Sequence, residues 1–563
     1  MKRSNIFNGA SVLALLLPLL LIVPNIALCV TEHLGFWSAL TNIILPLSVY
    51  SLLMSLWRRT GIMTFLMLPF MIYAGFQIVL LYLYGGSIIA VDMFLNVVTT
   101  NATEVGELLG NLIFAIGVVV TLYIPPMVWA VVLIFKKCTL PALFMYSFRK
   151  CAAAATVISC VILIITYLVT PGYNVLRDLF PVNVIANMCR AIKRTDDVAN
   201  YPRTSEGFSY NAVSAHPAET PEVYLLVIGE TSRGENWQLL GYERKNNPRL
   251  SEVDSLVVFK KAVTQSNTTH KSVPMLMSSL TAENFDSINY HKSILTAFKE
   301  AGYHTYLFSN QTRNRSYTEY FCNEADEQEY IKDRFGRYAQ DHELLNNLDK
   351  ALADTLYNKK FIVLHTYGSH FNYRDRYPEE YAHFIPDDYS DANKGNRDLL
   401  VNSFDNTILY VDSFLAKAIE KLKQTGVPSA MIYTSDHGED IFDDSRERFL
   451  HASPTPTFHQ LYVPMIAWLS SGYNNQFGNT AYNNLSGYRS QTLSPTETVF
   501  PTLLSIAGIS TPYLNRQKSL ADDRFESTPL LYVTDLNEAV SLENSGIREV
   551  DIKLFQEKQI NTK

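Results

Sequence analysis

Cysteine is scarce in this chain, with six among 563 residues. Four of them lie in or beside apolar segments: Cys29, Cys138, Cys151 and Cys160. The other two are Cys189 and Cys322, and because the sequence sets no distance between them, a disulfide and two unrelated thiols both stay open. No disulfide framework is predicted.

Long runs of lysine or arginine are also missing, and the formal net charge is -7 at pH 7. Nucleic-acid binding depends on clustered cations that neutralise phosphates. The composition therefore argues against a nucleic acid as partner. A mean hydropathy near zero conceals an apolar first third and a polar remainder, so we expect two parts.

Five apolar runs in the first third are long enough to cross a bilayer, which takes roughly 20 helical residues. They are residues 8–30, 36–56, 62–84, 111–135 and 152–170. The first run could be a signal peptide, but it is longer than a signal core, lacks a clean cleavage site and is followed by four more runs. We therefore predict a transmembrane domain of about five helices over residues 1–171.

The cations that flank these runs predict the orientation, because Lys and Arg are retained on the cytoplasmic side. Loops 31–35 and 85–110 contain no Lys or Arg. The other flanks carry pairs of cations: Lys2 and Arg3, Arg58 and Arg59, Lys136 and Lys137, and Arg149 and Lys150. With five spans and an inside start, everything after about residue 171 is expected outside the cytoplasm.

Residues 172–221 connect the two parts. Segment 172–195 carries apolar residues at approximately helical spacing with cations between them, which fits an amphipathic helix at the membrane surface or an ordinary domain helix. Segment 196–221 is rich in Ser, Pro, Ala and Thr without apolar periodicity, and it is interpreted as a linker.

From residue 222 to 563, short apolar runs alternate with helical stretches. Strands are predicted at 223–229, 304–309, 361–366, 430–435 and 463–470, with a further strand before residue 264. Helices are predicted at 289–301, 341–357, 396–425 and 495–507, the last with Ser494 and Glu497 in a capping box. This alternation predicts an α/β/α domain around a mostly parallel sheet.

Carboxylates and imidazoles follow three of these strands, and the carboxyl ends of parallel strands are where ligands gather. The residues are Glu230 with Thr231, then His365 and His370, then Asp436, His437 and Glu439, with His451 shortly after. Each residue alone is more often a helix cap, an ion-pair partner or part of a turn. Together they favour zinc, which takes N and O ligands, over calcium, which prefers more oxygens.

A candidate nucleophile lies in TQSNTTHKSVPM, residues 264–275. Thr268, Thr269 and Ser272 all offer a hydroxyl there. Thr268 or Ser272 could instead be the cap of a helix. Spacing alone does not choose between the threonines.

Six motifs in order resemble one family. They are VIGETSR at 227–233, GYERKNNPRL at 241–250, NTTHKSVPM at 267–275, LHTYGSH at 364–370, SDHGE at 435–439, and LHAS followed by Val463-Pro464. The chain resembles bacterial lipid A phosphoethanolamine transferases, which include the mobile colistin-resistance enzymes, in the sulfatase-like branch of the alkaline phosphatase superfamily. The resemblance implies an inner-membrane, multi-pass protein, expected to be a monomer, with a periplasmic sulfatase-like domain.

The resemblance also implies a role for each matching residue. Thr269 is the expected nucleophile, and Glu230, Asp436 and His437, together with Thr269, are the expected ligands of one tightly held zinc ion. His370 and His451 are the expected catalytic histidines that contact the transferred group or a second zinc. Substrate binding is assigned to Glu439, His365 and Asn310.

The implied reaction moves phosphoethanolamine from phosphatidylethanolamine through a covalent threonine intermediate to lipid A or another cell-envelope glycan. Two departures leave the acceptor open between lipid A and another cell-envelope glycan. The chain has Gln265-Ser266-Asn267-Thr268-Thr269 where many members have Cys-Gly-Thr-x-Thr, and it lacks the cysteines that form their periplasmic disulfides. The alternatives are a glycerol-phosphate transferase of the lipoteichoic-acid synthase type and an inactive membrane sensor or scaffold. A hydrolytic sulfatase is disfavoured because no Cys/Ser-x-Pro-x-Arg motif is evident.

Overall fold

The computed structural model describes residues 8–86, 88–99 and 112–562. It divides into two units, which we name after the parts predicted above: the membrane unit, largely residues 8–96 and 112–193, and the catalytic unit, most of the remainder. Lys2, Arg3 and residues 100–111, on which part of the predicted topology rests, lie outside the described residues.

The described part of the membrane unit has four helices long and apolar enough to cross a bilayer, or five if one bent pair counts as a single span. The bent pair is α4 and α5, which meet at 53°, and Pro69 in the first turn of α5 explains the bend because proline cannot continue the hydrogen-bond ladder. The prediction of about five membrane-spanning helices is confirmed, since α1 and α2 together form one candidate span and α4 and α5 another. The helices are α1 (Gly9–Leu21), α2 (Val23–Thr31), α3 (Phe36–Met54), α4 (Thr60–Leu66), α5 (Leu68–Tyr84), α6 (Val91–Thr99), α8 (Ile113–Phe135) and α9 (Ala142–Val169).

Helix α9 begins ten residues before the expected span, which was predicted to start at 152. The extra turns contain Arg149, a residue that the apolar pattern excludes. Its guanidinium donates to the carbonyls of Ser55 and Leu56, just past the end of α3, at 2.6–3.2 Å. The Arg149 guanidinium, which lies within α9, is therefore hydrogen-bonded by carbonyls at the end of α3 that have no partner inside their own helix.

The connecting segment is more helical than expected. Helix α10 (Val175–Asp178) is followed by α11 (Val182–Thr204), so the helix continues into residues 196–204, for which a linker was predicted. The side chain responsible is Tyr201, whose ring packs against Tyr317, Tyr320 and Phe321. Thr204 also donates to the Asn289 carbonyl at 2.6 Å. These tertiary contacts hold the last turns of α11, and they leave no periodic signal in the sequence.

The catalytic unit is built on a seven-stranded sheet with the order β3-β11-β8-β2-β7-β5-β6. Every adjacent pair is parallel except the two that β11 makes, which confirms the mostly parallel sheet. The edge strand β6 was not predicted because its sequence, Glu-Gln-Glu-Tyr, is polar. The strands are β2 (Glu222–Gly229), β3 (Leu256–Phe259), β5 (His304–Ser309), β6 (Glu327–Tyr330), β7 (Lys359–His365), β8 (Ser429–Ser435) and β11 (Met465–Leu469).

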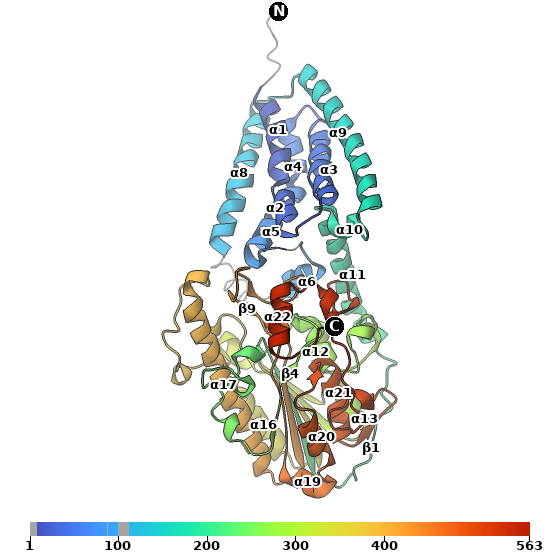
Figure 1. Cartoon of the computed structure of the whole chain (residues 1–563), viewed down its shortest axis with the longest axis vertical. Coiled ribbons are helices and arrows are strands. Elements are labelled where there is room, and N and C mark those ends of the chain that lie inside the picture. The colour runs from blue at the N-terminus through green and yellow to red at the C-terminus, as the bar shows by residue number, and fades with distance from the viewer. Residues whose placement is uncertain (1–7, 87, 100–111, 563) are drawn as a thin grey trace, which may run out of the picture. The chain divides into compact units, whose positions relative to one another are not determined.

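Alternate strand residues bury on opposite faces of this sheet, which accounts for the continuous apolar runs. Tyr224, Leu226 and Ile228 of β2 join a core with α12 (Thr269–Leu276), α13 (Ile294–Glu300) and α21 (Pro495–Ile506). Val223, Leu225 and Val227 join the opposite core with α16 (Glu343–Ala353) and α17 (Arg397–Gln424). Figure 1 shows the two helical layers on either side of the strands, as the predicted α/β/α architecture requires.

The predicted capping box at the start of α21 is wrong. Ser494 occupies the N-cap position but its side chain makes no cap hydrogen bond. Glu497 is drawn away because its carboxylate accepts from Gln265 Nε2 at 2.7 Å and from Lys518 Nζ at 2.8 Å.

Smaller elements complete the catalytic unit. Residues beyond 507, for which no element was predicted, form a hairpin of β14 and β15 and the helix α22, around a separate apolar cluster. The bounds are β1 (Val213–Ser214), β4 (Lys261–Ala262), β9 (Asp440–Ile441), β10 (Phe449–Leu450), β12 (Thr492–Leu493), β13 (Ile509–Ser510), β14 (Leu531–Val533), β15 (Ala539–Ser541), α14 (Tyr317–Cys322), α15 (Lys332–Phe335), α18 (Phe458–Leu461), α19 (Ser471–Phe477), α20 (Thr480–Tyr488) and α22 (Glu549–Glu557).

Candidate active site

Two neighbouring central strands deliver the first group of candidate residues. Gly229, the last residue of β2, pairs with Ser435, the last residue of β8. Glu230 directly follows β2, and Asp436 and His437 directly follow β8, so all three side chains gather at one edge of the sheet. The N–H of Asp436 donates to the Gly229 carbonyl at 3.0 Å, which fixes the two strand ends to each other.

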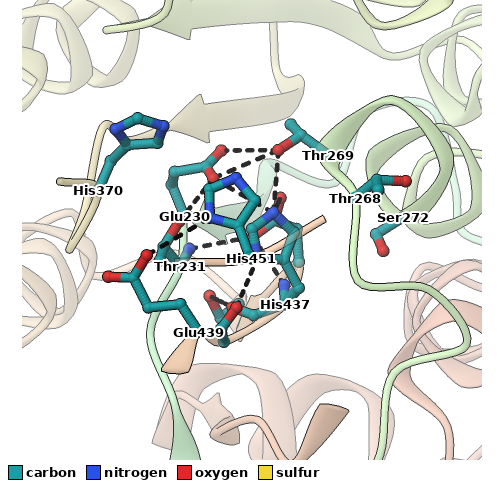
Figure 2. A network of polar contacts seen from close by, with 12 residues as sticks. Glu230, Thr231, Thr268, Thr269, Ser272, His370, His437, Glu439 and His451 are labelled. Atoms are coloured by element: carbon teal, nitrogen blue, oxygen red, sulfur yellow. Dashed lines mark hydrogen bonds and ion pairs between the residues drawn. The ribbon is translucent and has the colours of Figure 1, made fainter. Parts of the chain in front are cut away.

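Thr269 is the first residue of α12, and its hydroxyl points into this group (Figure 2). Its Oγ1 lies 3.1 Å from His437 Nε2 and 3.3 and 3.4 Å from the two carboxylate oxygens of Glu230. A single hydroxyl proton cannot satisfy all these acceptors. The start of a helix also carries a partial positive charge that favours an anionic oxygen there.

The other two hydroxyl candidates have different partners. Thr268 Oγ1 lies 3.1 Å from Ser266 Oγ, and Ser272 Oγ donates to the Ser266 carbonyl at 3.0 Å. Thr268 stands at the N-cap position but makes no cap hydrogen bond through its side chain. Of the three, Thr269 is the one whose hydroxyl contacts both Glu230 and His437 in the described structure.

The imidazole of His437 is oriented by its own loop. Its Nδ1 lies 2.9 Å from the Gly438 carbonyl, an acceptor that requires the proton on Nδ1. Nε2 therefore presents a lone pair toward Thr269 and Glu230, as in metal-ligating histidines. Burial and then the nearby His451 lower the pKa of His437 well below its usual value, so the ring is neutral.

Three buried carboxyl groups share the site, and burial raises the pKa of each. The pKa of Glu230 lies well above its usual value, through burial and then the charge of Asp436. Burial raises the pKa of Asp436 to about 6 and raises that of Glu439. A protein that buries three carboxylates this close together requires a cation or bound protons to offset their charge.

Two carboxylate oxygens identify where a cation fits. Asp436 Oδ2 and Glu439 Oε1 are buried and make no hydrogen bond of ordinary geometry among the described residues, although Thr269 lies near Asp436 and the Tyr373 hydroxyl near Glu439. Asp436 Oδ2 also lies 3.2 Å from His437 Nε2, so two lone pairs face each other. Glu230, His437 and His451 offer ligand atoms that all lie within 4.8 Å of one another. Nitrogen and oxygen donors in this number suit a transition metal such as zinc.

His451, Glu439 and His370 form the outer part of the site. His451 Nδ1 lies 3.4 Å from Glu439 Oε2, and the His451 ring lies 4.3 Å from the His437 ring and 5.5 Å from the His370 ring, centroid to centroid. His370 Nδ1 lies 2.6 Å from the Phe371 carbonyl. Burial, followed by the proximity of His451, lowers the pKa of His370 well below its usual value, which leaves the ring neutral.

The loop that carries His370 depends on a glycine. Gly368 has a φ of 55° in the left-handed region, and an added Cβ would lie 2.5 Å from the Glu230 carbonyl oxygen. Ser369 N–H donates to that same carbonyl at 2.9 Å. The motif LHTYGSH thus needs glycine at 368, because the loop passes directly over the backbone of Glu230.

The two remaining predicted residues lie apart from this network. His365 is the last residue of β7; it is buried, neither ring nitrogen has a hydrogen-bond partner in the described structure, and burial lowers its pKa to about 3. Asn310 donates to Asp341 Oδ1 at 2.8 Å, and Asp341 in turn accepts from the N–H groups of Tyr367 and Gly368. Asn310 is therefore connected to the His370 loop through Asp341.

Sequence reasoning missed Gln311, and it noted Thr231 after the first strand without giving it a role. Gln311 Nε2 donates to Glu230 Oε2 at 3.3 Å and to the Thr366 carbonyl at 2.8 Å. Thr231 Oγ1 donates to Glu230 Oε1 at 2.8 Å, and its φ of 61° is unusual for a β-branched residue. Gln311 follows β5 closely, and position after a strand end is the signal that could have found it.

A second buried group, the Arg233 cluster, has the same residue types. It consists of Arg233, Glu235, Asp443 and His459, and the ligand atoms of Glu235, Asp443 and His459 also lie within 4.8 Å of one another. Arg233 lies 2.7 Å from Asp443 and 3.3 Å from Glu235, and His459 lies 2.8 Å from Glu235. Arg233 Nη1 also donates to the Glu439 backbone carbonyl at 3.2 Å, so the cluster supports the active-site loop.

Comparison with known proteins identifies the family. Residues 222–509, just over half of the chain, match the model of the Sulfatase family. The chain belongs to this family. It is 30% identical over 302 residues to phosphoethanolamine transferase EptA of Escherichia coli K12, covering 51% of this chain and 54% of that protein. It is 29% identical over 265 residues to Kdo(2)-lipid A phosphoethanolamine 7''-transferase of Salmonella typhimurium, covering 46% of each. The chain thus spans about half the length of the curated relatives it matches.

Solved structures support the fold. The integral membrane lipooligosaccharide phosphoethanolamine transferase A of Neisseria meningitidis superposes with a TM-score of 0.71 at 22% identity, over 91% of this chain and 97% of that chain. The periplasmic domain of E. coli EptC, solved in complex with Zn, has a TM-score of 0.53 at 25% identity, over 59% of this chain and 94% of that chain. The predicted fold class and the family resemblance are confirmed.

Proposed function

We propose that this protein transfers phosphoethanolamine from phosphatidylethanolamine to lipid A or another cell-envelope glycan, through a covalent intermediate on Thr269. The observation that carries the proposal is the contact of the Thr269 hydroxyl with both His437 and Glu230 at 3.1–3.4 Å, at the start of a helix. Similarity to named phosphoethanolamine transferases supports this group over glycerol phosphate and over an inactive scaffold.

Glu230, Asp436 and His437, with the Thr269 oxygen, would hold one zinc ion. The buried Asp436 oxygen that makes no hydrogen bond of ordinary geometry among the described residues and the neutral Nε2 of His437 support this assignment. When bound, zinc would favour the alkoxide form of the threonine and offset negative charge on the phosphoryl oxygens. His370, His451 and Glu439 are the candidates to hold a second ion or the transferred group.

In the first step, the Thr269 oxygen forms a bond to phosphorus, and the bond from phosphorus to the diacylglycerol oxygen breaks. The threonine proton passes to a base, and diacylglycerol leaves with a proton on its released oxygen. In the second step, an acceptor oxygen forms a bond to phosphorus as the bond from phosphorus to Thr269 breaks; a hydroxyl acceptor gives its proton to a base, and the Thr269 oxygen takes a proton back. His370 and His451 are proposed to carry these protons, since His370 is neutral and both rings border the site.

The proposed setting is the bacterial inner membrane, with the catalytic unit in the periplasm and the chain acting as a monomer. The apolar helices and the placement of flanking cations support it. A membrane anchor raises the effective concentration of a lipid donor near the site. Glu439 remains a proposed contact of the substrate. His365 and Asn310 are proposed to support substrate binding indirectly, and Asn310 is linked to the loop that carries His370 through Asp341.

The test is intact-protein mass spectrometry of the purified full chain after incubation with phosphatidylethanolamine. Wild type and the matched control Thr268→Ala are expected to gain the mass of one phosphoethanolamine group, and Thr269→Ala is not. An adduct that persists in Thr269→Ala would remove the nucleophile assignment. An adduct formed from phosphatidylglycerol but not from phosphatidylethanolamine would replace the proposed group with glycerol phosphate.

The acceptor is tested separately. Cells expressing the wild-type chain or Thr269→Ala are compared by mass spectrometry of extracted lipid A and of the core oligosaccharide. Phosphoethanolamine on either component, present with wild type and missing with Thr269→Ala, identifies the acceptor. Neither component being modified would exclude both acceptors.

A further inference from the structure

Asn267 lies two residues before Thr269 and is buried with every polar atom of its side chain bonded. Its Nδ2 donates to the Ser453 carbonyl at 2.8 Å and to Gln460 Oε1 at 2.7 Å, and its Oδ1 accepts from the Tyr532 hydroxyl at 2.8 Å. Its backbone carbonyl accepts from the Ala452 N–H at 3.1 Å. One residue of the nucleophile loop therefore binds the two residues that directly follow His451.

The backbone on both sides of His451 is strained. Leu450 has a φ of 69° and Ala452 a φ of 59°, both in the left-handed region that non-glycine residues rarely adopt. Such a conformation costs free energy and persists where surrounding contacts over-determine it. The position of the His451 ring thus depends on whatever holds these two neighbours.

Gln460 supplies the second half of that support. Its Nε2 donates to the Leu450 carbonyl at 3.2 Å and to Asp440 Oδ2 at 2.8 Å. Its Oε1 accepts from Asn267 and from Ser453 Oγ, the latter at 3.0 Å. Asn267 and Gln460 thus hold the strained loop from both of its ends and are bonded to each other.

We propose that Asn267 and Gln460 form an amide clamp that positions His451 relative to Thr269. The inference rests on the proposed function, in which His451 carries a proton at the transferred group. Asn267 and Gln460 are positioning residues because neither touches the proposed reacting atoms. Thr269 is the first residue of α12 and its hydroxyl contacts Glu230 and His437, so we expect loss of the clamp to displace His451 more than the nucleophile.

The first test compares three variants of the full chain in phosphoethanolamine transfer. Asn267→Ala is expected to lower the rate about 10- to 100-fold, the range typical of losing a supporting partner of a site residue. Asn267→Asp is expected to be equally slow, because it keeps the shape but faces two oxygens, those of Ser453 and Gln460, with a carboxylate. The matched control is Asn406→Ala, which removes an equally buried amide of α17 that bonds to the Phe384 carbonyl and to Asp387, and it should keep the wild-type rate.

A double-mutant cycle separates positioning from general structural damage. If Asn267 acts through His451, the variant carrying both Asn267→Ala and His451→Ala transfers at the rate of His451→Ala alone. In the matched cycle, Asn406→Ala combined with His451→Ala should transfer at the rate of His451→Ala, because Asn406→Ala alone is expected to keep the wild-type rate. Fully additive losses from Asn267→Ala and His451→Ala would overturn the proposal.

Hydrogen exchange keeps the clamp testable even if no transfer is found, an outcome that would count against the proposed function instead. Peptides covering residues 449–455 are expected to exchange faster in Asn267→Ala than in wild type, and to be unchanged in Asn406→Ala. Unchanged exchange of this segment in Asn267→Ala would refute the clamp whatever the activity.

Discussion

The Thr269 site and the Arg233 cluster contain the same residue types at similar separations. Each brings three ligand atoms within 4.8 Å of one another, from one carboxylate and two histidines in the Thr269 site and from two carboxylates and one histidine in the Arg233 cluster. Residues shortly after β2 contribute to both groups. By residue type and distance alone, either could be a metal centre.

The two groups differ in where their positive charge comes from. Arg233 lies between Glu235 and Asp443, and the cluster balances itself within the protein. Burial alone would lower the pKa of His459, but Glu235 and Asp443 raise it to about 9, so this imidazole is charged. His437 is instead neutral, and in the Thr269 site two buried carboxylate oxygens make no hydrogen bond of ordinary geometry among the described residues.

Charge balance therefore separates a structural ion cluster from a candidate metal site where residue types do not. A buried carboxylate that already faces a guanidinium gains little from a metal ion. A buried carboxylate that faces other carboxylates and a neutral imidazole is strongly stabilised by a bound metal ion. The variants below change one member of each group so that the two can be compared directly.

The largest expected contrast is between His437→Gln and His459→Gln. His437→Gln should lose bound zinc and at least about 100-fold in transfer rate, the scale of removing one contact to the transition state. His459→Gln should keep its zinc, because no ligand of the Thr269 site is removed. Metal content by elemental analysis and transfer rate, measured on the same purified samples, check both. Equal loss of zinc in the two variants would mean that the Arg233 cluster also binds metal.

The next contrast concerns stability. Arg233→Met should destabilise the catalytic unit by about 3–5 kcal/mol, because it leaves Glu235 and Asp443 buried without their main counter-charge. Arg244→Met is the matched control: Arg244 is one-third exposed and lies 2.9 Å from Asp405, so a much smaller loss is expected. Denaturant unfolding of the two variants in detergent measures both. Similar losses would show that the Arg233 cluster does not depend on its arginine.

The contacts that define these two groups also show how far sequence can predict a site. Glu230, Asp436 and His437 were found because each follows a continuous apolar strand, and a parallel sheet brings strand ends together. Arg233 was visible in a motif, but its partner Asp443 is 210 residues away, and no local pattern links them. Gln311 was missed for the same reason, since its contact with Glu230 exists only after β5 and β2 are placed in one sheet.

The fold was predictable where apolar periodicity is strong. It was not predictable where a tertiary contact determines the local structure. The strands β2, β5, β7, β8 and β11 and the helices α16, α17 and α21 follow from their sequence patterns, whereas α13 is shorter than predicted. The polar edge strand β6, the last turns of α11 held by Tyr201, and the strained backbone beside His451 each depend on a tertiary contact that overrides local preference. Spacing left Thr268 and Thr269 equivalent, whereas the direction of each hydroxyl distinguishes them.

The smallest expected effect is the dependence of stability on pH that the charged His459 confers. Unfolded histidine has a pKa of about 6.5 and His459 in the native protein about 9, so the native state binds more protons between these values. The stabilisation is complete below pH 6.5 and is lost as pH rises through 9, by about 3 kcal/mol in total. His437 and His370 have lowered pKa values and are neutral in the native state throughout this window, so they affect the slope only near pH 6.5, where their unfolded forms still bind protons. Unfolding measured at several pH values should therefore show a steeper loss in wild type than in His459→Gln, which cannot bind the proton. Parallel curves for the two proteins would mean that His459 is neutral, and that the Arg233 cluster is balanced by its arginine alone.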